Sequence, residues 1–266
     1  MLLAAAPGIQ AGVDRGIGSE AYDIWQVDSD QEQNAVTTVI QSHEGYLWLG
    51  TYHGLARFDG VRFDVFDSDN SPALPNGLIT SLYEDGDGVL WIGHETGQLT
   101  RLTEHGFESV PLADKWPGGA IESIAADEQD DLWLLNDAGV LFRLRDNSAV
   151  PVPGGASATR KVGLVRSSSG RLWIVSNGSV STLERGQVVP FRFGSAPLDV
   201  FVERVLPARD GGLWVLANQR LRKWKAGRWT LDLDVGSRQP GSIGVLLETT
   251  AGNVLAGTLR EGLFLL

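Results

Sequence analysis

The chain of 266 residues contains no cysteine, and this absence excludes several kinds of chemistry. Without cysteine there are no disulfides, no thiolate metal ligands and no cysteine nucleophile. The absence leaves the cellular compartment open, because many periplasmic proteins also lack cysteine. The motif G-x-S-x-G of a serine nucleophile elbow is missing as well. The sequence therefore gives no support for covalent catalysis, although a fold alone never excludes an activity.

Long apolar runs and basic clusters are also missing. No apolar stretch reaches the length of about 18 residues that a membrane-spanning helix needs. The net charge is −11, and no cluster of lysine or arginine interrupts this acidic character. The charge argues against nucleic acid and against an anionic membrane surface as partners.

What the sequence does contain is a tryptophan that returns behind the same kind of turn. Its successive spacings are 43, 42, 40 and 41 residues, and one more step of 41 reaches a leucine. A fixed period near 40 residues is typical of repeat architectures. The six repeat positions are Trp48, Trp91, Trp133, Trp173, Trp214 and Leu255.

Two columns before the tryptophan position recur in nearly every copy. A glycine stands three residues before it in five copies, whereas the third copy has Asp130. A glycine suits a hairpin turn because it reaches φ > 0 without a Cβ clash. Nine residues before the tryptophan position the sequence has Val39, Leu82, Ile124, Leu164, Val205 and Leu246.

Each copy predicts two β-hairpins in succession. In the first copy the strands are expected at 36–41, 46–50, 54–58 and 61–66, with polar or glycine-containing turns between them. Four strands in 40 to 45 residues are typical of a propeller blade. We therefore predict an all-β fold, a β-propeller of four-stranded blades forming one domain over residues 22–266. The repeated tryptophans are expected in the core between blades.

The two ends of the sequence bear on the number of blades. Six blades are visible, the sixth ends after its third strand, and residues 22–27 resemble a stray fourth strand. Either this strand completes the sixth blade, or the sequence is a fragment of a seven-bladed ring; we predict the latter. Residues 1–21 are interpreted as a signal-peptide remnant with a cleavage site near Ala11, or as a disordered tail.

At these residues the sequence resembles a known family. The stretch Val39–Asp64, with Gly45-Tyr46-Leu47-Trp48-Leu49-Gly50-Thr51 at its centre, is similar to the two-component regulator propeller repeat, and so is Leu82–Gly93. The resemblance covers roughly 22–266 and fades after the second copy. It implies a non-catalytic ligand-sensing domain of a bacterial transmembrane signalling protein. In such proteins the propeller lies on the periplasmic or extracellular side of the inner membrane, ahead of a histidine kinase or a diguanylate cyclase.

The loops after the tryptophan strands are the predicted ligand site. Such loops gather on one face of a propeller near its channel, and binding residues are often carried by loops on a rigid scaffold. The loop 67–77 is expected on this face too, as a lid or as a spacer between blades. The loops are polar, which suits the hydroxyl groups of an oligosaccharide but equally suits simple contact with water. The candidate residues are Tyr52, His53, His94, Glu95, Asn136, Asp137, Asn177, Asn218 and Gln219.

Other candidate groups receive structural interpretations. His43, His53, His94 and His105 occupy four different repeat columns, so repeat symmetry does not build a metal site from them. Asp85-Gly86-Asp87-Gly88 resembles the start of a calcium loop, but a strand follows at once, which favours a hairpin turn. We predict no metal and no cofactor. Outside the repeat column, Trp116, Trp224 and Trp229 are freer to contact a ligand.

The expected partner is a small molecule or an oligosaccharide, with a homodimer formed through the full-length protein. Two other functions stay open. One is a secreted propeller lyase or glycoside hydrolase, which turnover by the isolated propeller would reveal. The other is a scaffold that binds only protein.

Overall fold

The structure is a computed structural model of the chain, and it describes residues 12–13, 23–24, 36–75, 77–112, 116–152, 163–194, 201–235, 243–249, 252–258 and 263–266. Every regular element in these residues is a β-strand. Within the same residues no helix has the length and apolar character needed to cross a membrane. The predicted signal-peptide remnant and the predicted strand 22–27 lie mostly outside this set. From them the structure describes only a short antiparallel pair of β1 (Gly12–Val13) and β2 (Asp23–Ile24).

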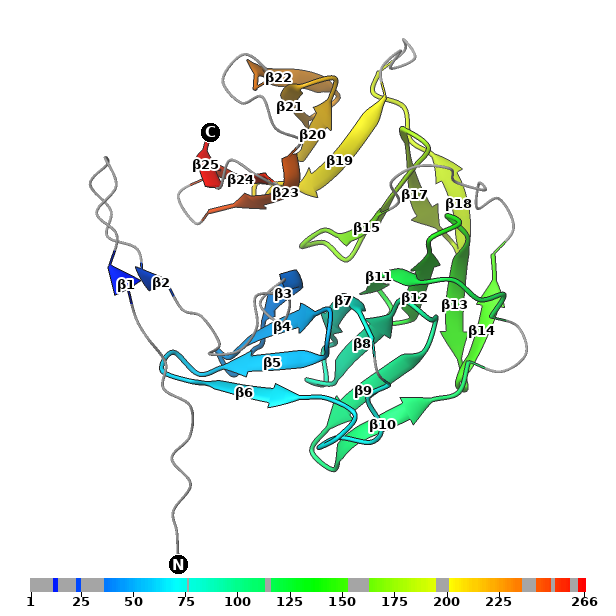
Figure 1. Ribbon diagram of the computed structural model, residues 1–266. Helices are drawn as coiled ribbons and strands as arrows, with labels where there is room; N and C mark the ends of the chain where they lie inside the picture. The colour runs from blue at the N-terminus through cyan, green and yellow to red at the C-terminus, as the bar shows by residue number, and fades with distance from the viewer. Residues whose placement is uncertain are drawn as a thin grey trace, which may run out of the picture. The chain divides into compact units, whose positions relative to one another are not determined.

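The chain divides into two compact units, Met1–Val110 and Pro111–Leu266. The first unit contains blades one and two. Blade one consists of β3 (Val36–Gln41), β4 (Leu47–Thr51), β5 (Leu55–Phe58) and β6 (Phe63–Phe66). Blade two consists of β7 (Ile79–Glu84), β8 (Leu90–His94), β9 (Leu99–Thr103) and β10 (Gly106–Val110). In both blades each strand pairs with the next one along the chain, as Figure 1 shows.

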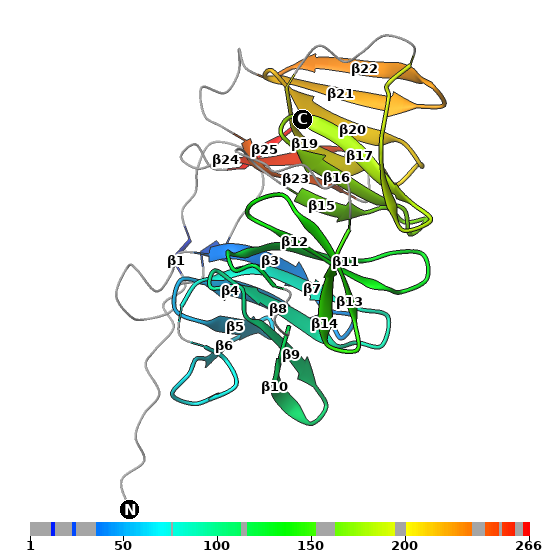
Figure 2. The same cartoon turned by 90° about the vertical axis from the view of Figure 1, so that its right-hand side faces the viewer.

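The second unit contains blades three to six. Blade three is β11 (Ile121–Ala126), β12 (Leu132–Asn136), β13 (Leu141–Arg145) and β14 (Ser148–Pro151). Blade four is β15 (Gly163–Arg166), β16 (Leu172–Ser176), β17 (Ser179–Glu184) and β18 (Gln187–Pro190). Blade five, seen in Figure 2, is β19 (Val202–Pro207), β20 (Leu213–Ala217), β21 (Arg220–Lys225) and β22 (Arg228–Asp234). Blade six has three strands, β23 (Ile243–Glu248), β24 (Val254–Thr258) and β25 (Leu263–Leu265).

The repeated tryptophans lie in the second strand of each blade, and the prediction that they belong to the core is confirmed for four of them. Trp48, Trp133, Trp173 and Trp214 are between 1% and 7% exposed, whereas Trp91 is half-buried. In the first unit Trp48 packs in one cluster with Ile79 and Leu82 of blade two. In the second unit Trp214 packs in the same way with Leu246 of blade six. In these two pairs of blades the tryptophan thus covers the aliphatic column of the blade that follows.

One member of the aliphatic column differs from the others in its exposure. Leu82, Ile124, Leu164, Val205 and Leu246 are 5% to 8% exposed, but Val39 of blade one is 54% exposed. The described residues form six blade sheets, and the seventh blade stays a prediction.

The segment 67–77 joins the two blades of the first unit as a spacer. Ser71 N donates to Asp67 O, and Leu74 N donates to Ser71 O, so the segment folds into consecutive turns. Leu74 is 1% exposed and belongs to the cluster around Trp48. Thr100 Oγ1 of blade two also donates to Ala73 O. Of the two interpretations made from the sequence, the structure favours the spacer over the lid.

Gly54 gives the first test of this fold. Its φ is +144°, and a Cβ there would collide with the carbonyl oxygen of Phe66 on the neighbouring strand. We expect Gly54→Ala to destabilise the protein by roughly 1–3 kcal/mol from backbone strain alone, with the collision added to that. Gly60→Ala is the matched control, because Gly60 also has a positive φ, +96°, but has open space around it. Urea unfolding of both variants checks this, and equal losses would contradict it.

Candidate functional site

The predicted ligand residues lie in the turn between the second and third strands of each blade. In blades four and five this turn has two residues, both with positive φ, as a type I′ hairpin requires. Asn177 and Gly178 have φ of 51° and 75°, and Asn218 and Gln219 have φ of 49° and 60°. Asparagine is favoured at such positions because its short side chain tolerates the left-handed region. Turn geometry therefore accounts for part of the polar character that the sequence shows here.

His94 is not displayed on the loop surface, contrary to expectation. Its side chain is 2% exposed, and Nε2 lies 3.1 Å from Thr100 Oγ1. Because the Thr100 hydroxyl donates its only proton to Ala73 O, it must accept from Nε2–H of His94. Burial lowers the pKa of His94 to about 4, so the ring is neutral at pH 7. Its place is inside the first unit, where it links the third strand of blade two to the segment before that blade.

Asn136 is buried for a similar reason. It is 1% exposed, and its Oδ1 accepts a hydrogen bond of 2.8 Å from Val140 N. Its backbone N–H donates to Val140 O, and its carbonyl accepts from Gly139 N. The side chain thus holds a four-residue turn closed from within. For His94 and Asn136 the expectation of a surface position is wrong, because His94 bonds to Thr100 of the next strand and Asn136 closes its own turn.

The other predicted residues are exposed. Tyr52 is 53% exposed, and His53, Asn177, Asn218 and Gln219 are exposed in their hairpin turns. Glu95 is exposed too, and its Oε1 accepts from Leu78 N at 3.3 Å. The backbone N–H groups of Glu95 and Asp137 each donate to the residue before the first strand of their own blade, Leu78 O and Ala120 O. For these seven side chains the role as ligand contacts stays a prediction.

A β-bulge, missed in the sequence, lies in the first strand beside these turns. The register against the second strand shifts in five blades, always at the same repeat position. A bulge re-aims one side chain and is frequent next to functional sites. The residue eleven before the tryptophan position is the one displaced. The bulged residues are Thr37, Thr80, Glu122, Glu203 and Gly244.

In the second unit two of the bulged residues line one cavity of about 380 Å³. Glu122 and Glu203 share it with Arg204 and with apolar side chains of the first strands, among them Val165 and Val205. Burial, and after it the charge of Asp137, raises the pKa of Glu122. The predicted loop residue Asp137 therefore acts through its charge on a glutamate of this cavity. In the sequence, each of the two glutamates directly follows an apolar residue at the start of the first strand, which is a weak signal.

Arg204 is the cation of this cavity, which we call the bulge cavity. Burial lowers the pKa of its guanidinium, and the charge of Glu203 opposes that effect. Its Nε is buried and has no hydrogen-bond partner among the described residues. An unpaired buried donor costs about 1–3 kcal/mol, so a ligand oxygen that accepts from it would be well bound. Two carboxylates beside it offer acceptors for ligand hydroxyl groups.

No metal centre emerges from the part of the chain that the structure describes, since no three His, Asp or Glu side chains converge there. The segment that resembles a calcium loop is a hairpin turn, as expected. Asp85 Oδ1 accepts from Asp87 N and Val89 N at 3.0 Å and 2.9 Å, and its Oδ2 accepts from Trp91 Nε1 at 2.7 Å. The carboxylate is therefore used by its own blade.

The tryptophans outside the repeat column take part in packing. Trp116 lies 4.7 Å from the ring of Phe142 and donates from Nε1 to Gly119 O. Trp224 and Trp229 meet edge to face at 5.0 Å, and Trp229 also stacks on Phe193 at 5.1 Å. All three are half-buried. Packing thus explains them without a ligand.

Successive antiparallel sheets, each built from strands in chain order and four of them carrying a buried tryptophan on the second strand, define a β-propeller. The family model for the two component regulator propeller matches residues 73–96, which contain β7 and β8 of blade two. This match confirms the resemblance predicted at Leu82–Gly93. No curated protein matches the sequence.

Solved structures share the fold at low identity. The extracellular domain of a putative hybrid two component system from B. thetaiotaomicron is 18% identical with a TM-score of 0.64, covering 88% of this chain and 34% of its own. A second such domain from the same organism is 16% identical, with a TM-score of 0.55 and coverages of 88% and 38%. Virginiamycin B lyase from Staphylococcus aureus is 14% identical, with a TM-score of 0.64 and coverages of 89% and 85%. The chain thus spans about a third of the length of the two-component relatives, and these likenesses show the fold alone.

Proposed function

We propose that this chain is a non-catalytic ligand-sensing propeller domain of a bacterial transmembrane signalling protein. The match of residues 73–96 to the two component regulator propeller carries this proposal, and the propeller fold supports it. The domain would lie on the periplasmic or extracellular side of the inner membrane. Its output would be a histidine kinase or a diguanylate cyclase, and the full-length protein would act as a homodimer.

The ligand that the bulge cavity suits best is a small polar molecule or an oligosaccharide. Arg204 offers a donor that is unpaired among the described residues, and Glu122 and Glu203 offer acceptors. Neighbouring exposed loop residues such as Asp137 would extend the contacts. Binding changes the output only if the ligand has different affinities for two states of the protein, so the cavity must differ between those states.

The experiment is a binding and turnover screen of the 266-residue chain with neutral and acidic oligosaccharides. Calorimetry measures binding, and mass spectrometry of the same mixtures measures any product. We expect binding with no change to the oligosaccharide. We expect Arg204→Gln to weaken binding about tenfold or more, since a hydrogen bond from a charged group is lost. Arg145→Gln, at an exposed arginine of β13, is the matched control.

Turnover in this screen would instead favour a propeller lyase or glycoside hydrolase. The virginiamycin B lyase structure shares the fold, with 85% of its length covered by this chain, so the fold is compatible with that second candidate. Carboxylates in one cavity, one of them with a raised pKa, are also a usual feature of acid–base catalysis. Unchanged binding in Arg204→Gln would place the ligand elsewhere.

A further inference from the structure

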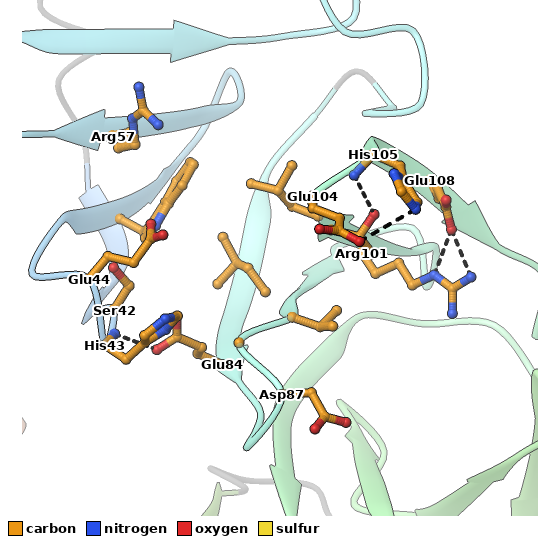
Figure 3. Close-up of a pocket in the computed structure, with 16 residues that line it drawn as sticks. Ser42, His43, Glu44, Arg57, Glu84, Asp87, Arg101, Glu104, His105 and Glu108 are labelled. Atoms are coloured by element: carbon orange, nitrogen blue, oxygen red, sulfur yellow. Dashed lines mark hydrogen bonds and ion pairs between the residues drawn. The ribbon is translucent and has the colours of Figure 1, made fainter.

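A second cavity, of about 760 Å³, lies within the first unit between blades one and two. The first turn of blade one forms one wall, and two turns of blade two, β7–β8 and β9–β10, form the other, as Figure 3 shows. These turns are at the strand ends opposite to the predicted loops, because β3 ends where β4 begins. We call it the inter-blade cavity. Its volume is within the range of about 300–1,000 Å³ that is usual for small-molecule sites.

The inter-blade cavity carries a net negative charge. Five carboxylates and two arginines line it, and each arginine forms an ion pair through Nη2, although Arg57 Nε is buried without a hydrogen-bond partner among the described residues. Arg101 Nη2 lies 2.7 Å from Glu108 Oε2, and Arg57 Nη2 lies 2.7 Å from Asp64 Oδ2. Glu44 and Asp87 at the rim form no ion pair with the described residues. This charge disfavours an anionic ligand, and the rim carboxylates can accept hydrogen bonds.

Comparison of the blades shows that the inter-blade cavity lacks a turn carboxylate that two other blades have. We call its place the unfilled position. In blades two and three the turn opens with an aspartate whose carboxylate accepts from the tryptophan of the same blade: Asp85 from Trp91 Nε1 at 2.7 Å, and Asp127 from Trp133 Nε1 at 2.9 Å. Blade one has Ser42 at this repeat position.

The turn of blade one nevertheless keeps the same backbone geometry. Ser42 N donates to Tyr46 O and Ser42 O accepts from Gly45 N, as the backbone of Asp85 does with Val89 and Gly88. Only the side chain differs, so blade one lacks the carboxylate and not the turn.

Because blade one has serine in place of aspartate, two of its groups have no hydrogen-bond partner within the described part of the chain. Ser42 is 6% exposed, and its Oγ is buried with no hydrogen-bond partner there. Trp48 lines the inter-blade cavity too, and its indole N–H has no partner among the described residues. Buried polar groups are nearly always hydrogen-bonded, so Ser42 Oγ calls for an outside oxygen, and the Trp48 indole N–H is a donor that could bind the same oxygen.

The carboxylate of the following blade does not supply that oxygen. In blade five, Trp214 Nε1 is satisfied by Glu248 Oε1 of blade six at 3.2 Å. The equivalent residue for blade one is Glu84 of blade two. Its Oε1 is engaged by His43 Nδ1 at 2.9 Å, and its Oε2 accepts from His43 N at 2.7 Å. Glu84 therefore clamps the turn of blade one and leaves the position beside Ser42 open.

We propose that the inter-blade cavity binds a neutral, hydroxyl-rich small molecule of the size of a mono- or disaccharide. One ligand hydroxyl takes the place that the turn aspartate holds in blades two and three, accepting from the Trp48 indole N–H and bonding to Ser42 Oγ. Further hydroxyls donate to Glu44 and Asp87. A hydroxyl is the group that both accepts and donates, whereas an ammonium offers no acceptor to Trp48 and a carboxylate meets repulsion.

Ser42→Asp tests this proposal, because the introduced carboxylate would occupy the position of the ligand hydroxyl, as the turn aspartate does in blades two and three. The unlabelled probes are glucose, galactose, maltose and cellobiose, with glucuronate and spermidine as charged comparisons. We expect a neutral sugar to bind the full chain and Ser42→Asp to weaken that binding at least tenfold. Ser42→Ala, which only removes the hydroxyl, should weaken it less. Ser167→Asp is the matched control, because Ser167 holds the same repeat position in blade four but bonds within its own turn.

The four histidines report where the sugar binds. His43 and His105 line the inter-blade cavity, whereas His53 and His94 do not. In NMR spectra of the imidazole groups, a sugar should shift the signals of His43 and His105 only. The same spectra show whether Ser42→Asp is folded; if it is not, Ser42→Ala and the shifts decide.

Each other outcome overturns the assignment. Binding that Ser42→Asp and Ser42→Ala leave unchanged, or shifts confined to His53 and His94, would place the sugar outside the inter-blade cavity. Binding of glucuronate or spermidine in preference, or of no probe at all, would overturn the neutral ligand. The proposed function is tested separately, since Arg204→Gln acts on a different unit and leaves this cavity intact.

Discussion

Acidification from pH 7 to pH 4 is expected to destabilise the first unit by about 3 kcal/mol through His94. The pKa of this buried ring is lowered from 6.5 to about 4 in the folded protein, so the unfolded chain binds a proton more readily. Stability is therefore full above pH 6.5 and falls as the pH drops below that value. The loss is complete once the pH is below the folded pKa.

The measurement is urea unfolding followed at several pH values between 7 and 4. His94→Gln should lower the stability at pH 7, because the bond to Thr100 is disturbed, and should make the fall between pH 6.5 and pH 4 shallower. His53→Gln removes an exposed imidazole of the same unit and is the control for the loss of a histidine. A slope unchanged in His94→Gln would mean that carboxylates alone govern acid unfolding.

The tryptophan period predicted the blades well, because the information it uses is local. A turn with glycine, an apolar column and an aromatic within a few residues define the first hairpin of a blade, and five copies of that hairpin lie where expected. The partial exposure of Trp91 was not foreseen. Its indole N–H is satisfied by Asp85, but how deeply a ring lies depends on the neighbouring blade.

A second repeated feature was missed because loop lengths vary. The residue that pairs across from the tryptophan is a cation in four blades: Arg57, Arg101, Arg143 and Lys223. In three of them it lies over the ring, at 5.7 Å, 5.7 Å and 4.7 Å. The turn before it differs by one residue between copies, so the cation does not keep a constant spacing from the tryptophan in the sequence. Only the strand register shows that the four cations hold equivalent positions.

The predicted site shows where sequence reasoning ends. Polar residues in a turn look alike in a sequence, yet His94 and Asn136 point into the protein and Tyr52 points to solvent. The bulge that places Glu122 and Glu203 in one cavity has no glycine or proline to mark it. Ser42 was not singled out from the sequence, because aspartate stands at its repeat position in only two copies and its meaning depends on the tryptophan six residues later and on a glutamate of the next blade.

Removal of the Trp133 ring is expected to destabilise the protein more than any of the other substitutions. Trp133 is 1% exposed, and Arg143 lies over its ring at 5.7 Å. Trp133→Ala should lower the free energy of unfolding by about 3–5 kcal/mol, since it removes buried apolar surface and leaves a cavity. Trp133→Phe keeps most of the ring and loses the N–H bond, so it should cost less. Trp173→Phe, whose N–H has no aspartate partner among the described residues, is the comparison for that lost bond.

Asp127→Ser gives blade three the serine that blade one has at this repeat position. It removes the hydrogen bond to the Trp133 indole N–H but keeps the ring, so the contribution of the bond can be measured apart from that of the ring. Asp127 is 8% exposed, and its carboxylate accepts from Gln129 N, Asp131 N and Trp133 Nε1. Leaving these donors without an acceptor should cost about 1–3 kcal/mol, whereas Glu128→Ser at the exposed neighbouring position should cost little. In a double-mutant cycle with Trp133→Phe, the two losses should be less than additive, because both remove one bond. Strict additivity would mean that the aspartate stabilises the turn alone, and the unfilled position in blade one would then need no ligand oxygen at Trp48.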